Sequence, residues 1–283
     1  MSDPVFDHPQ VAALIDLALA EDVGAGDRTS LAVVPGAARA RGRVLAKDRL
    51  VVCGVPLLER VLGRLGPVRV VVHDADGATV EPGRVVATVE GDARALLAGE
   101  RLVLNLLQHL SGIATLTRRC VDAVRGTALV VRDTRKTVPG MRRLAKYAVR
   151  TGGGANHRMA LDDAILVKDN HLTLSGRALA ETVRLARAAW PALPLEVECR
   201  TLDDLRAALD AGPDLILLDN MTVDAIRDAV ALAAGRIPLE VSGGVRPADL
   251  PAVAATGVAY VAMGAITHSA PAVDLSLKLE PLA

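Results

Sequence analysis

Residues 194–219 read PLEVECRTLDDLRAALDAGPDLILLD. Two short, nearly continuous apolar runs, PLEVEC and DLILLD, flank a segment whose apolar residues follow helical spacing. Such runs are typical of strands buried on both faces of a parallel sheet, and parallel strands need a crossover between them. Thr201 stands where an N-cap of the helical segment is expected. The stretch therefore predicts a strand–helix–strand unit.

The same pattern recurs through the second half of the chain. From residue 128 onward ALVV, AILV, PLEVEC, DLILLD, IPLEV and VAYVAM alternate with helix-like segments, among them residues 223–234 behind Thr222. This repetition predicts parallel βα units, as in an α/β barrel, whose strand ends meet on one face and build the site there. Polar groups follow or end the six runs: residues 132–136, Lys168-Asp169, Glu198, Asp219, Ser242-Gly243-Gly244 and Gly264.

An alternative explanation of the polar strand ends is that strands end where the chain meets solvent, so that polar residues are expected there without any function. Glu198 and Lys168 argue against that interpretation, since they stand inside an apolar run or directly after one. A charge in such a position is costly unless it is paired. The six strand ends are therefore expected to converge on one pocket.

The first half of the chain has a different texture. Residues 11–18 follow helical spacing and Gly24 and Gly26 supply a stop. Between residues 42 and 90 the β-rich pieces VLAK, VRVVV and RVVATVE, with turn signals at Asp76-Gly77 and Pro82-Gly83, predict a small sheet. Residues 92–124 carry a broad apolar helical face and predict a long helix.

Composition excludes several classes of protein. The 283 residues are 51% hydrophobic, which suits one large barrel or two modest domains, and the 33 basic side chains balance the 33 acidic ones. A neutral chain has no global attraction to nucleic acid or to an anionic membrane. The absence of a signal-like start and of an uncharged apolar run of about 20 residues predicts a soluble, cytoplasmic protein. Three widely spaced cysteines indicate buried thiols rather than disulfides or a zinc site.

One segment departs from this neutrality. Residues 132–171 hold nine Arg or Lys against four Asp or Glu, which predicts anion binding. A solvated basic face is the alternative, and it fits the helical Arg142, Arg143 and Arg150. The glycine triplet at residues 152–154 indicates either a close backbone approach to a ligand or the end of a helix. Strand ends and the loop around the triplet carry the candidates for anion binding: Arg135, Lys136, His157, Arg158 and Lys168.

Two glycine turns follow the last two apolar runs. Residues 242–244 and 263–265 occupy the place where many barrels bind phosphate through backbone N–H groups, although plain tight turns would look the same. Glu198 and Asp219 are candidates to hold ribose hydroxyls or the waters of a Mg²⁺ ion, or else to form structural ion pairs. Cations, carboxylates and a phosphate loop together suit displacement of pyrophosphate at a sugar carbon.

The chemistry-bearing segment resembles a known family. RDTRKTVPGMRRLAKYAVRTGGGANHRMALDDAILVKDNH, residues 132–171, is similar to the signature of the quinolinate phosphoribosyltransferases, the carboxylating nicotinate-nucleotide pyrophosphorylases. EDVGAGDRTS, ERLVLNLLQHLSGIAT, LILLDNM, EVSGGV and AMGAITHS resemble further blocks of that family in the same order. The resemblance thus extends along nearly the whole chain. Met159-Ala160 and Val241 depart from the usual pattern and affect the expected loop packing more than the chemistry.

The resemblance implies an activity and an architecture. The activity is conversion of quinolinate and phosphoribosyl pyrophosphate to nicotinate mononucleotide, pyrophosphate and CO₂, with Mg²⁺, in NAD biosynthesis. The architecture is an N-terminal α/β sandwich domain, residues 1–110 joined by the tail 270–283, followed by an open α/β barrel at residues 111–269. The tail segment DLSLKLE alternates with period two, as a strand of the N-terminal sheet would. A homodimer is implied, and a hexamer is the larger assembly considered.

The resemblance also assigns roles to individual residues. Those expected to act in catalysis are Lys136, Lys168, Glu198 and Asp219, with Glu198 and Asp219 near Mg²⁺ through water and pyrophosphate. Arg101 is expected to reach the neighbouring subunit's site. The residues expected to bind substrate are Arg101, Arg135, His157, Arg158 and Lys168 around quinolinate, Lys136 and Lys168 at pyrophosphate, Glu198 and Asp219 at ribose, Ser242, Gly243, Gly244, Met263, Gly264 and Ala265 at the 5′-phosphate, and also Thr134.

Three other functions remain open at the level of sequence. Lys168 at a strand end would suit a Schiff-base lyase. A related phosphoribosyltransferase with another substrate, including the molybdate-transport-associated relatives, would share much of the pattern. A phosphate-binding barrel without catalysis would leave the charged strand ends without a use.

Overall fold

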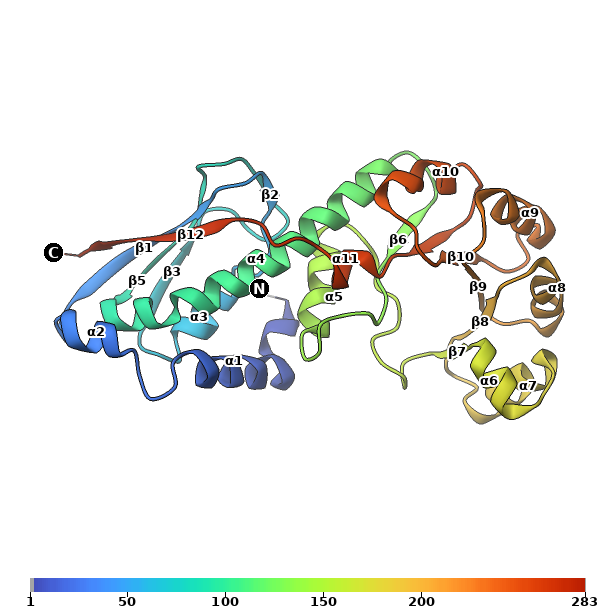
Figure 1. Ribbon diagram of the computed structural model, residues 1–283, viewed down its shortest axis with the longest axis horizontal. Coiled ribbons are helices and arrows are strands. Elements are labelled where there is room, and N and C mark those ends of the chain that lie inside the picture. The colour runs from blue at the N-terminus through green and yellow to red at the C-terminus, as the bar shows by residue number, and fades with distance from the viewer. Residues whose placement is uncertain (1–2, 283) are drawn as a thin grey trace. The chain divides into compact units, whose positions relative to one another are not determined.

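The computed structural model describes residues 3–282 of the chain, which form two compact units (Figure 1). The first unit contains the residues up to Arg118, the segment Thr137–Gly153, and the residues from His268 onward. The second contains Arg119–Lys136 and Gly154–Thr267. The first division between the units falls after Arg118, within the long helix α4 (Ala93–Ala123).

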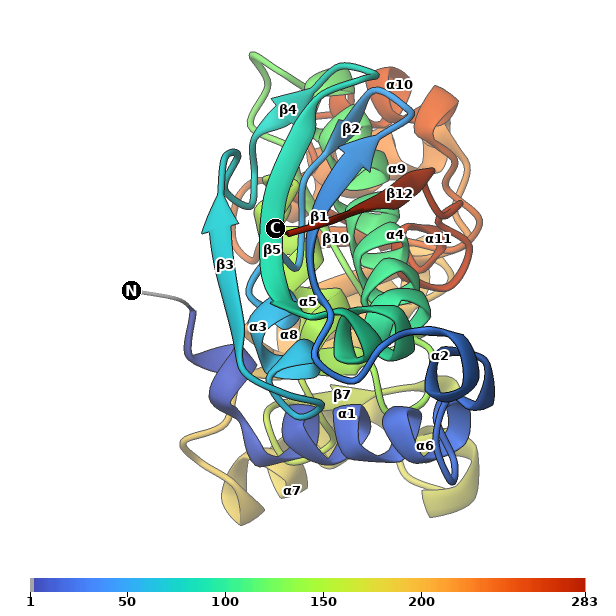
Figure 2. The same cartoon turned by 90° about the vertical axis from the view of Figure 1, so that its left-hand side faces the viewer.

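An antiparallel sheet in the order β12-β1-β5-β3 forms the centre of the first unit. The C-terminal strand pairs with β1, so the period-two pattern of that segment does form a strand of this sheet. Figure 2 shows α4 running along one face of the sheet. The strands of the unit are β1 (Arg39–Ala46), β3 (Val68–Val72), β5 (Val85–Asp92), β12 (Leu275–Pro281) and the small pair β2 (Leu50–Val51) and β4 (Thr79–Val80).

Helices α1 (Pro9–Asp22) and α4 of the first unit lie where the sequence predicts helices. Gly77 and Gly83, at the two predicted turns, both have positive φ. The basic side chains Arg143 and Arg150 bond to Gln10 and Asp3 within this unit, which supports their assignment to a helix face outside the anion site. The helices are η1 (Pro4–Asp7), α1 (Pro9–Asp22), α2 (Arg28–Val33), α3 (Leu57–Leu62), α4 up to Arg118, and α5 (Arg142–Thr151).

The second unit is an open barrel of parallel strands. Six strands follow the order β6-β11-β10-β9-β8-β7, and β6 and β7 are edges that do not pair with each other within residues 3–282. Each of the six expected apolar runs forms one strand. They are β6 (Val130–Arg132), β7 (Ile165–Val167), β8 (Leu195–Cys199), β9 (Leu215–Asp219), β10 (Leu239–Ser242) and β11 (Tyr260–Ala262).

Helices cover the outer side of this sheet. Thr201 and Thr222 are the N-caps that the sequence predicts, and each side chain accepts the backbone N–H of the third residue of its helix. The helices are α6 (Asp169–Ser175), α7 (Leu179–Ala189), α8 (Leu202–Ala211), α9 (Val223–Ala233), η2 (Pro247–Asp249), α10 (Leu250–Ala254) and α11 (Ala265–His268), the last ending at the first residue of the other unit.

The glycine triplet is explained by packing. Gly152 caps α5, and a Cβ added there would lie 2.6 Å from the carbonyl oxygen of Ala114 and 2.6 Å from Cβ of Thr117, both on α4. Gly153 has a φ of +94°. Of the two interpretations of the triplet, the structure therefore supports the helix end. The three cysteines are free and buried, as predicted, and burial raises the pKa of Cys199 to about 12.

Replacing Gly152 by Ala is expected to destabilise the fold by about 1–3 kcal/mol, because the new methyl group overpacks the contact between α4 and α5. Chemical denaturation measures the loss. Gly36→Ala is the matched control, since its added Cβ meets nothing nearer than 3.7 Å. Equal stability of the two variants would contradict the packing argument.

Candidate active site

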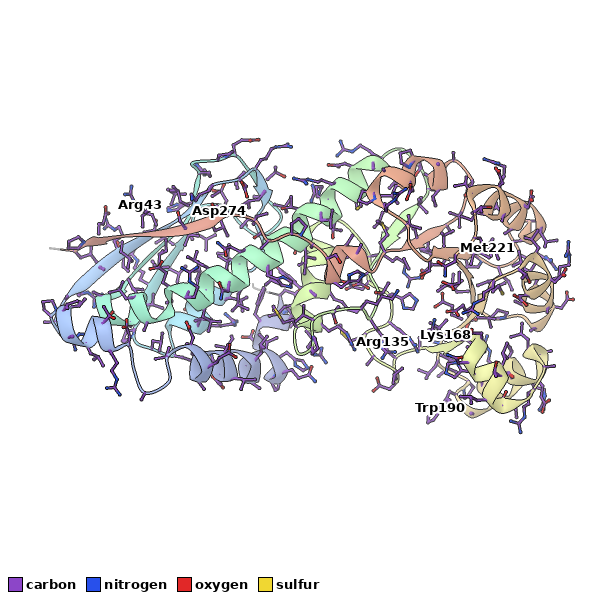
Figure 3. The ribbon with its side chains drawn as sticks, in the orientation of Figure 1. Arg43, Arg135, Lys168, Trp190, Met221 and Asp274 are labelled. Carbon is purple, nitrogen blue, oxygen red and sulfur yellow. The ribbon has the colours of Figure 1, made fainter. Side chains whose placement is uncertain are left out.

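An oppositely charged pair, Lys168 and Glu198, lies at the ends of two neighbouring barrel strands. Val167 on β7 pairs with Val197 on β8. The next residues along these parallel strands, Lys168 and Glu198, therefore lie beside each other. Their Nζ and Oε2 atoms form an ion pair, in which the Glu198 side chain is 5% exposed and that of Lys168 43% exposed. The buried carboxylate thus anchors an ammonium group that still reaches solvent. Figure 3 labels Lys168 together with Arg135 among the loops that follow β7 and β6.

The next strand ends supply a second carboxylate. Asp219 pairs in register with Ser242. Asn220 has a φ of +56°, donates its backbone N–H to the Ser242 carbonyl at 2.9 Å, and donates its side-chain amide to Asp219 at 2.8 Å. Nε of Arg200 lies 3.8 Å from the Asp219 carboxylate. Asp219 is therefore held on the same edge as Glu198, with a cation close by.

The two predicted glycine turns lie at this edge as well. Gly243 and Gly244 have φ of +98° and +63°, and a Cβ on Gly243 would lie 2.3 Å from Oδ1 of Asn220. Within residues 3–282, no hydrogen bond engages the backbone N–H of Gly243, Gly244 or Gly264. These N–H groups remain available to an anion.

A threonine connects the loop after β6 to the second glycine turn. The Thr267 hydroxyl donates to the Lys136 carbonyl at 2.8 Å and lies 3.1 Å from the Gly264 carbonyl. Met263 donates its N–H to the Arg132 carbonyl. The loop of Thr134, Arg135 and Lys136 therefore sits beside the turn at residues 263–265.

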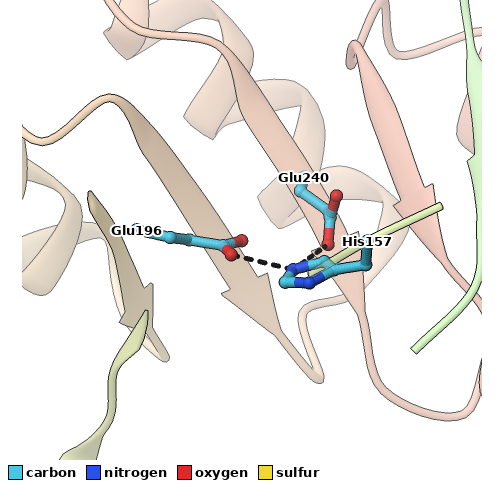
Figure 4. A group of neighbouring side chains, drawn as sticks. All are labelled: His157, Glu196 and Glu240. Atoms are coloured by element: carbon cyan, nitrogen blue, oxygen red, sulfur yellow. Dashed lines mark hydrogen bonds and ion pairs between the residues drawn. The ribbon is translucent and has the colours of Figure 1, made fainter. Parts of the chain in front are cut away.

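A second layer of charge lies deeper in the barrel. His157 Nε2 is 2.9 Å from Glu196 Oε2 and 3.4 Å from Glu240 Oε1 (Figure 4). Glu240 also accepts a 2.6 Å hydrogen bond from Arg132. Glu196 and Glu240 each stand two residues before a strand-end residue and so project to the same side of their strands. The interior of this barrel is charged.

The pKa values of Glu240 and Arg158 are shifted by their surroundings. Burial, reinforced by the carboxylate of Glu196, raises the pKa of Glu240 to about 7, while Arg132 and His157 act in the opposite direction. Burial and the neighbouring Arg135 lower the pKa of Arg158. Arg135 and Arg158 are therefore close enough to repel each other. The carboxylates of Glu196 and Asp163 act on Arg158 in the opposite direction. A partly buried guanidinium group is suited to bind a carboxylate.

The structure gathers most, but not all, of the residues singled out from sequence. Arg101 lies exposed on α4 in the first unit. His157 points into the interior network, and Arg158 donates to the Ala164 carbonyl just before β7. Those at the carboxyl edge of the strands are Thr134, Arg135, Lys136, Lys168, Glu198, Asp219, Ser242, Gly243, Gly244, Met263, Gly264 and Ala265.

Sequence reasoning missed Glu196 and Glu240, and it included Arg132 only as the first residue of a polar strand end. The signal that identified Glu198, a charge inside an apolar run, was equally present for Glu196 in PLEVEC and for Glu240 in IPLEV. Period-two alternation would have placed Glu196 on the same face as Glu198.

The carboxylates at the strand ends fit a loosely held hard cation. Glu198 and Asp219 offer oxygen ligands, and within residues 3–282 they belong to no group of three metal-ligating side chains. Mg²⁺ commonly takes one or two carboxylates and completes its shell with substrate phosphates and water. Glu198 and Asp219 are the residues that would hold such an ion.

These features define a class of protein before any comparison is made: an open α/β-barrel enzyme that acts on phosphorylated small molecules, of the phosphoribosyltransferase type. The chain belongs to the quinolinate phosphoribosyltransferase family. Residues 27–111 match the family's N-terminal domain and residues 113–278 its C-terminal domain. Among the described residues, no helix has the length and apolar character needed to cross a membrane.

Relatives extend over the whole chain. The carboxylating nicotinate-nucleotide pyrophosphorylase of Mycobacterium leprae is 44% identical, with 99% of this chain and 100% of that protein covered. A probable enzyme of the same name from Bacillus subtilis is 40% identical, covering 96% and 94%. The crystal structure of Streptococcus pyogenes NadC has a TM-score of 0.93 at 37% identity, covering 100% of this chain and 99% of that one.

Replacing Glu240 by Gln is expected to flatten the pH dependence of stability. A carboxyl group whose pKa rises from 4.5 to about 7 on folding binds a proton more tightly in the folded state. Stability therefore falls as pH rises from about 4.5 to about 7, by on the order of 3 kcal/mol for this group, and then stays level. Denaturant unfolding at pH 5 and pH 8 measures the difference.

Glu81→Gln is the control, since Glu81 forms an exposed ion pair in the first unit. The control is expected to keep the wild-type pH dependence. An unchanged difference between pH 5 and pH 8 in Glu240→Gln would contradict the buried, proton-binding state of Glu240.

Proposed function

We propose that this protein transfers the phosphoribosyl group of phosphoribosyl pyrophosphate to quinolinate, releasing pyrophosphate and CO₂ and forming nicotinate mononucleotide for NAD biosynthesis. The observation that carries the proposal is the charged edge of the barrel, where Lys168 is paired with the nearly buried Glu198 close to Asp219 and to the N–H groups of the glycine turns. Quinolinate bears two adjacent carboxylates, which would bind the cationic side chains of Arg135 and Arg158. The names of the curated relatives support the same reaction.

The remaining strand ends suit the second substrate. The free N–H groups of the two glycine turns would bind the 5′-phosphate. Glu198 and Asp219 would hold the ribose hydroxyls, and Lys136 and Lys168 would face the pyrophosphate. The ion pair with Glu198 fixes Lys168 at the edge where that pyrophosphate would lie. The site would then offer a cation or backbone N–H groups at each position where substrate carries negative charge.

The chemistry needs little from the protein beyond orientation and charge. The pyridine nitrogen would form a bond to the ribose anomeric carbon as the bond to pyrophosphate breaks, and the electron pair would leave with pyrophosphate. Lys136 and Lys168 would stabilise the leaving charge, while Glu198 and Asp219 would favour the oxocarbenium-like sugar. Loss of CO₂ would then leave an electron pair on the ring carbon beside the cationic nitrogen, and a solvent proton would complete the product.

Mg²⁺ forms part of this proposal. When bound, it would neutralise the pyrophosphate charge through oxygen ligands. Glu198 and Asp219 would contact its water shell, which agrees with their being two separate carboxylates and not a three-ligand cage.

We further propose a homodimer in which Arg101 completes the partner's site, with a hexamer as a larger assembly of such dimers. Arg101 is exposed on α4 and belongs to the first unit, whereas the strand-end candidates for substrate binding belong to the second. The cytoplasm is the compartment that we propose from the sequence.

The Schiff-base alternative is less well supported by the geometry. A lysine that attacks a carbonyl must present a neutral amine. The Nζ atom of Lys168 is instead paired with the nearly buried carboxylate of Glu198. This contact suits an ammonium group that binds anions.

Purified protein supplied with quinolinate, phosphoribosyl pyrophosphate and Mg²⁺ is expected to release CO₂ and nicotinate mononucleotide in equal amounts. Nicotinate in place of quinolinate is expected to give no product, because its single carboxylate cannot bind both Arg135 and Arg158. Chromatography of the nucleotide and trapping of labelled CO₂ measure the two products. Turnover of nicotinate without quinolinate turnover would reassign the substrate, and turnover of neither would contradict the proposal.

Mixing two inactive variants tests the shared site. Arg101→Ala removes the proposed arm and Lys168→Ala disables the barrel, so a mixed dimer would contain one intact site. Co-refolding equal amounts is expected to restore about a quarter of wild-type activity, because half of the dimers are mixed and each has one native site. Each variant alone is the control. No recovery in a preparation shown to contain mixed dimers would place Arg101 in its own subunit's site or outside any site.

A further inference from the structure

The imidazole of His157 lies between two buried carboxylates that come from different strands of the barrel. Glu196 on β8 is 5% exposed and Glu240 on β10 is fully buried. Figure 4 shows the ring between them, with Nε2 directed to both. Neither glutamate reaches the strand-end layer, where Glu198 and Ser242 lie two residues further on. They are therefore placed to support the site from below.

Hydrogen bonds fix the tautomer of the ring. Nδ1 accepts the backbone N–H of Arg158 at 2.7 Å, so this nitrogen offers a lone pair and carries no proton. The ring proton must then be on Nε2, from which it is donated to Glu196 at 2.9 Å. Both ring nitrogens are engaged within the protein. A hydrogen bond from His157 to a substrate carboxylate would require one of these contacts to break.

The backbone around His157 is held as firmly as its ring. The buried Asp133 accepts the His157 N–H at 2.8 Å and the Asn156 side-chain amide at 2.6 Å. Asp133, at the end of β6, thus holds residues 156 and 157 by hydrogen bonds. Glu196 on β8 and Glu240 on β10 hold the imidazole ring of His157. The next residue is Arg158, whose N–H is the one that the ring accepts.

Arg158 needs such support. Burial and, after it, the like charge of Arg135 lower the pKa of Arg158, while the carboxylates of Glu196 and Asp163 act in the opposite direction. A side chain meets a substrate in one fixed geometry only where a second layer of hydrogen bonds holds it. The contacts of Glu196, Glu240 and Asp133 with the residue before Arg158 supply that restraint.

We propose that Glu196 and Glu240 are positioning residues that hold His157 as its Nε2–H tautomer and thereby fix the backbone from which Arg158 meets the substrate dicarboxylate. The assignment of a substrate rests on the proposed function, whereas the tautomer does not.

The same three side chains also satisfy the spacing of a metal site, since their ligand atoms lie within 4.8 Å of one another. A metal ion would need the Nε2 lone pair, which the proton occupies in the Nε2–H tautomer. Arg132 already places a cation 2.6 Å from Glu240. The hydrogen bonds therefore favour a proton over a metal ion.

Nitrogen-15 NMR of histidine-labelled protein tests the tautomer without any substrate. The His157 signals, assigned by their loss in His157→Gln, are expected at the positions of a protonated Nε2 and an unprotonated Nδ1. Glu196→Gln keeps an acceptor oxygen and is expected to keep this pattern. A protonated Nδ1, or a transition metal found in equal amount to the purified protein, would overturn the proposal.

Steady-state kinetics tests the positioning role. Glu196→Ala is expected to raise the KM for quinolinate about 10- to 100-fold, the range of a lost hydrogen bond to a charged group, and to leave the KM for phosphoribosyl pyrophosphate within about twofold. Glu196→Gln is expected to restore most of the quinolinate KM. Glu181→Ala, which removes an exposed helix ion pair, is the matched control and is expected to behave as wild type.

The outcomes separate the two proposals. If wild-type protein does not turn over quinolinate, the proposed function fails while the NMR result still decides the tautomer. If wild-type protein is active and Glu196→Ala raises both KM values equally, or neither, the positioning role is wrong. A circular dichroism melt of each variant shows whether a change in KM accompanies loss of the fold.

Discussion

Side chains alternate along the parallel strands of the barrel, and this alternation requires every inward charge to find a partner. On β8, Val197 and Cys199 are fully buried while Glu196 and Glu198 project to the opposite side. Charges cannot stay unpaired on a strand flanked by apolar neighbours. Lys168 forms an ion pair with Glu198, and His157 forms a hydrogen bond with Glu196. The position of the site follows from these pairings.

The paired charges form two layers with different tasks. In the deeper layer, Arg132, His157, Glu196 and Glu240 pair mainly with one another. The layer at the strand ends has side chains and glycine N–H groups that still reach solvent. The deeper layer holds the loop that carries Arg158, and the upper layer would receive the substrates. Binding of anionic substrates would relieve the repulsion between Arg135 and Arg158.

Much of the fold could be predicted because it depends on local patterns. Short apolar runs and the Thr201 and Thr222 caps locate the strands and helices of the barrel, and strand order then places Lys168 beside Glu198. The interior network could not be predicted in the same way. The loop that carries His157 has no periodic pattern, so nothing in it shows that the ring enters the barrel. Gly152 also needed the structure, since only the approach of α4 explains it.

The central claim is that Arg135 and Arg158 together bind the two carboxylates of one substrate, and calorimetric binding measures this most directly. Quinolinate, nicotinate and picolinate would be titrated into the protein without phosphoribosyl pyrophosphate, at low and high salt. The account predicts that quinolinate binds at least about tenfold more tightly than either monocarboxylate and that added salt weakens this preference. Equal affinity for the three ligands would contradict it.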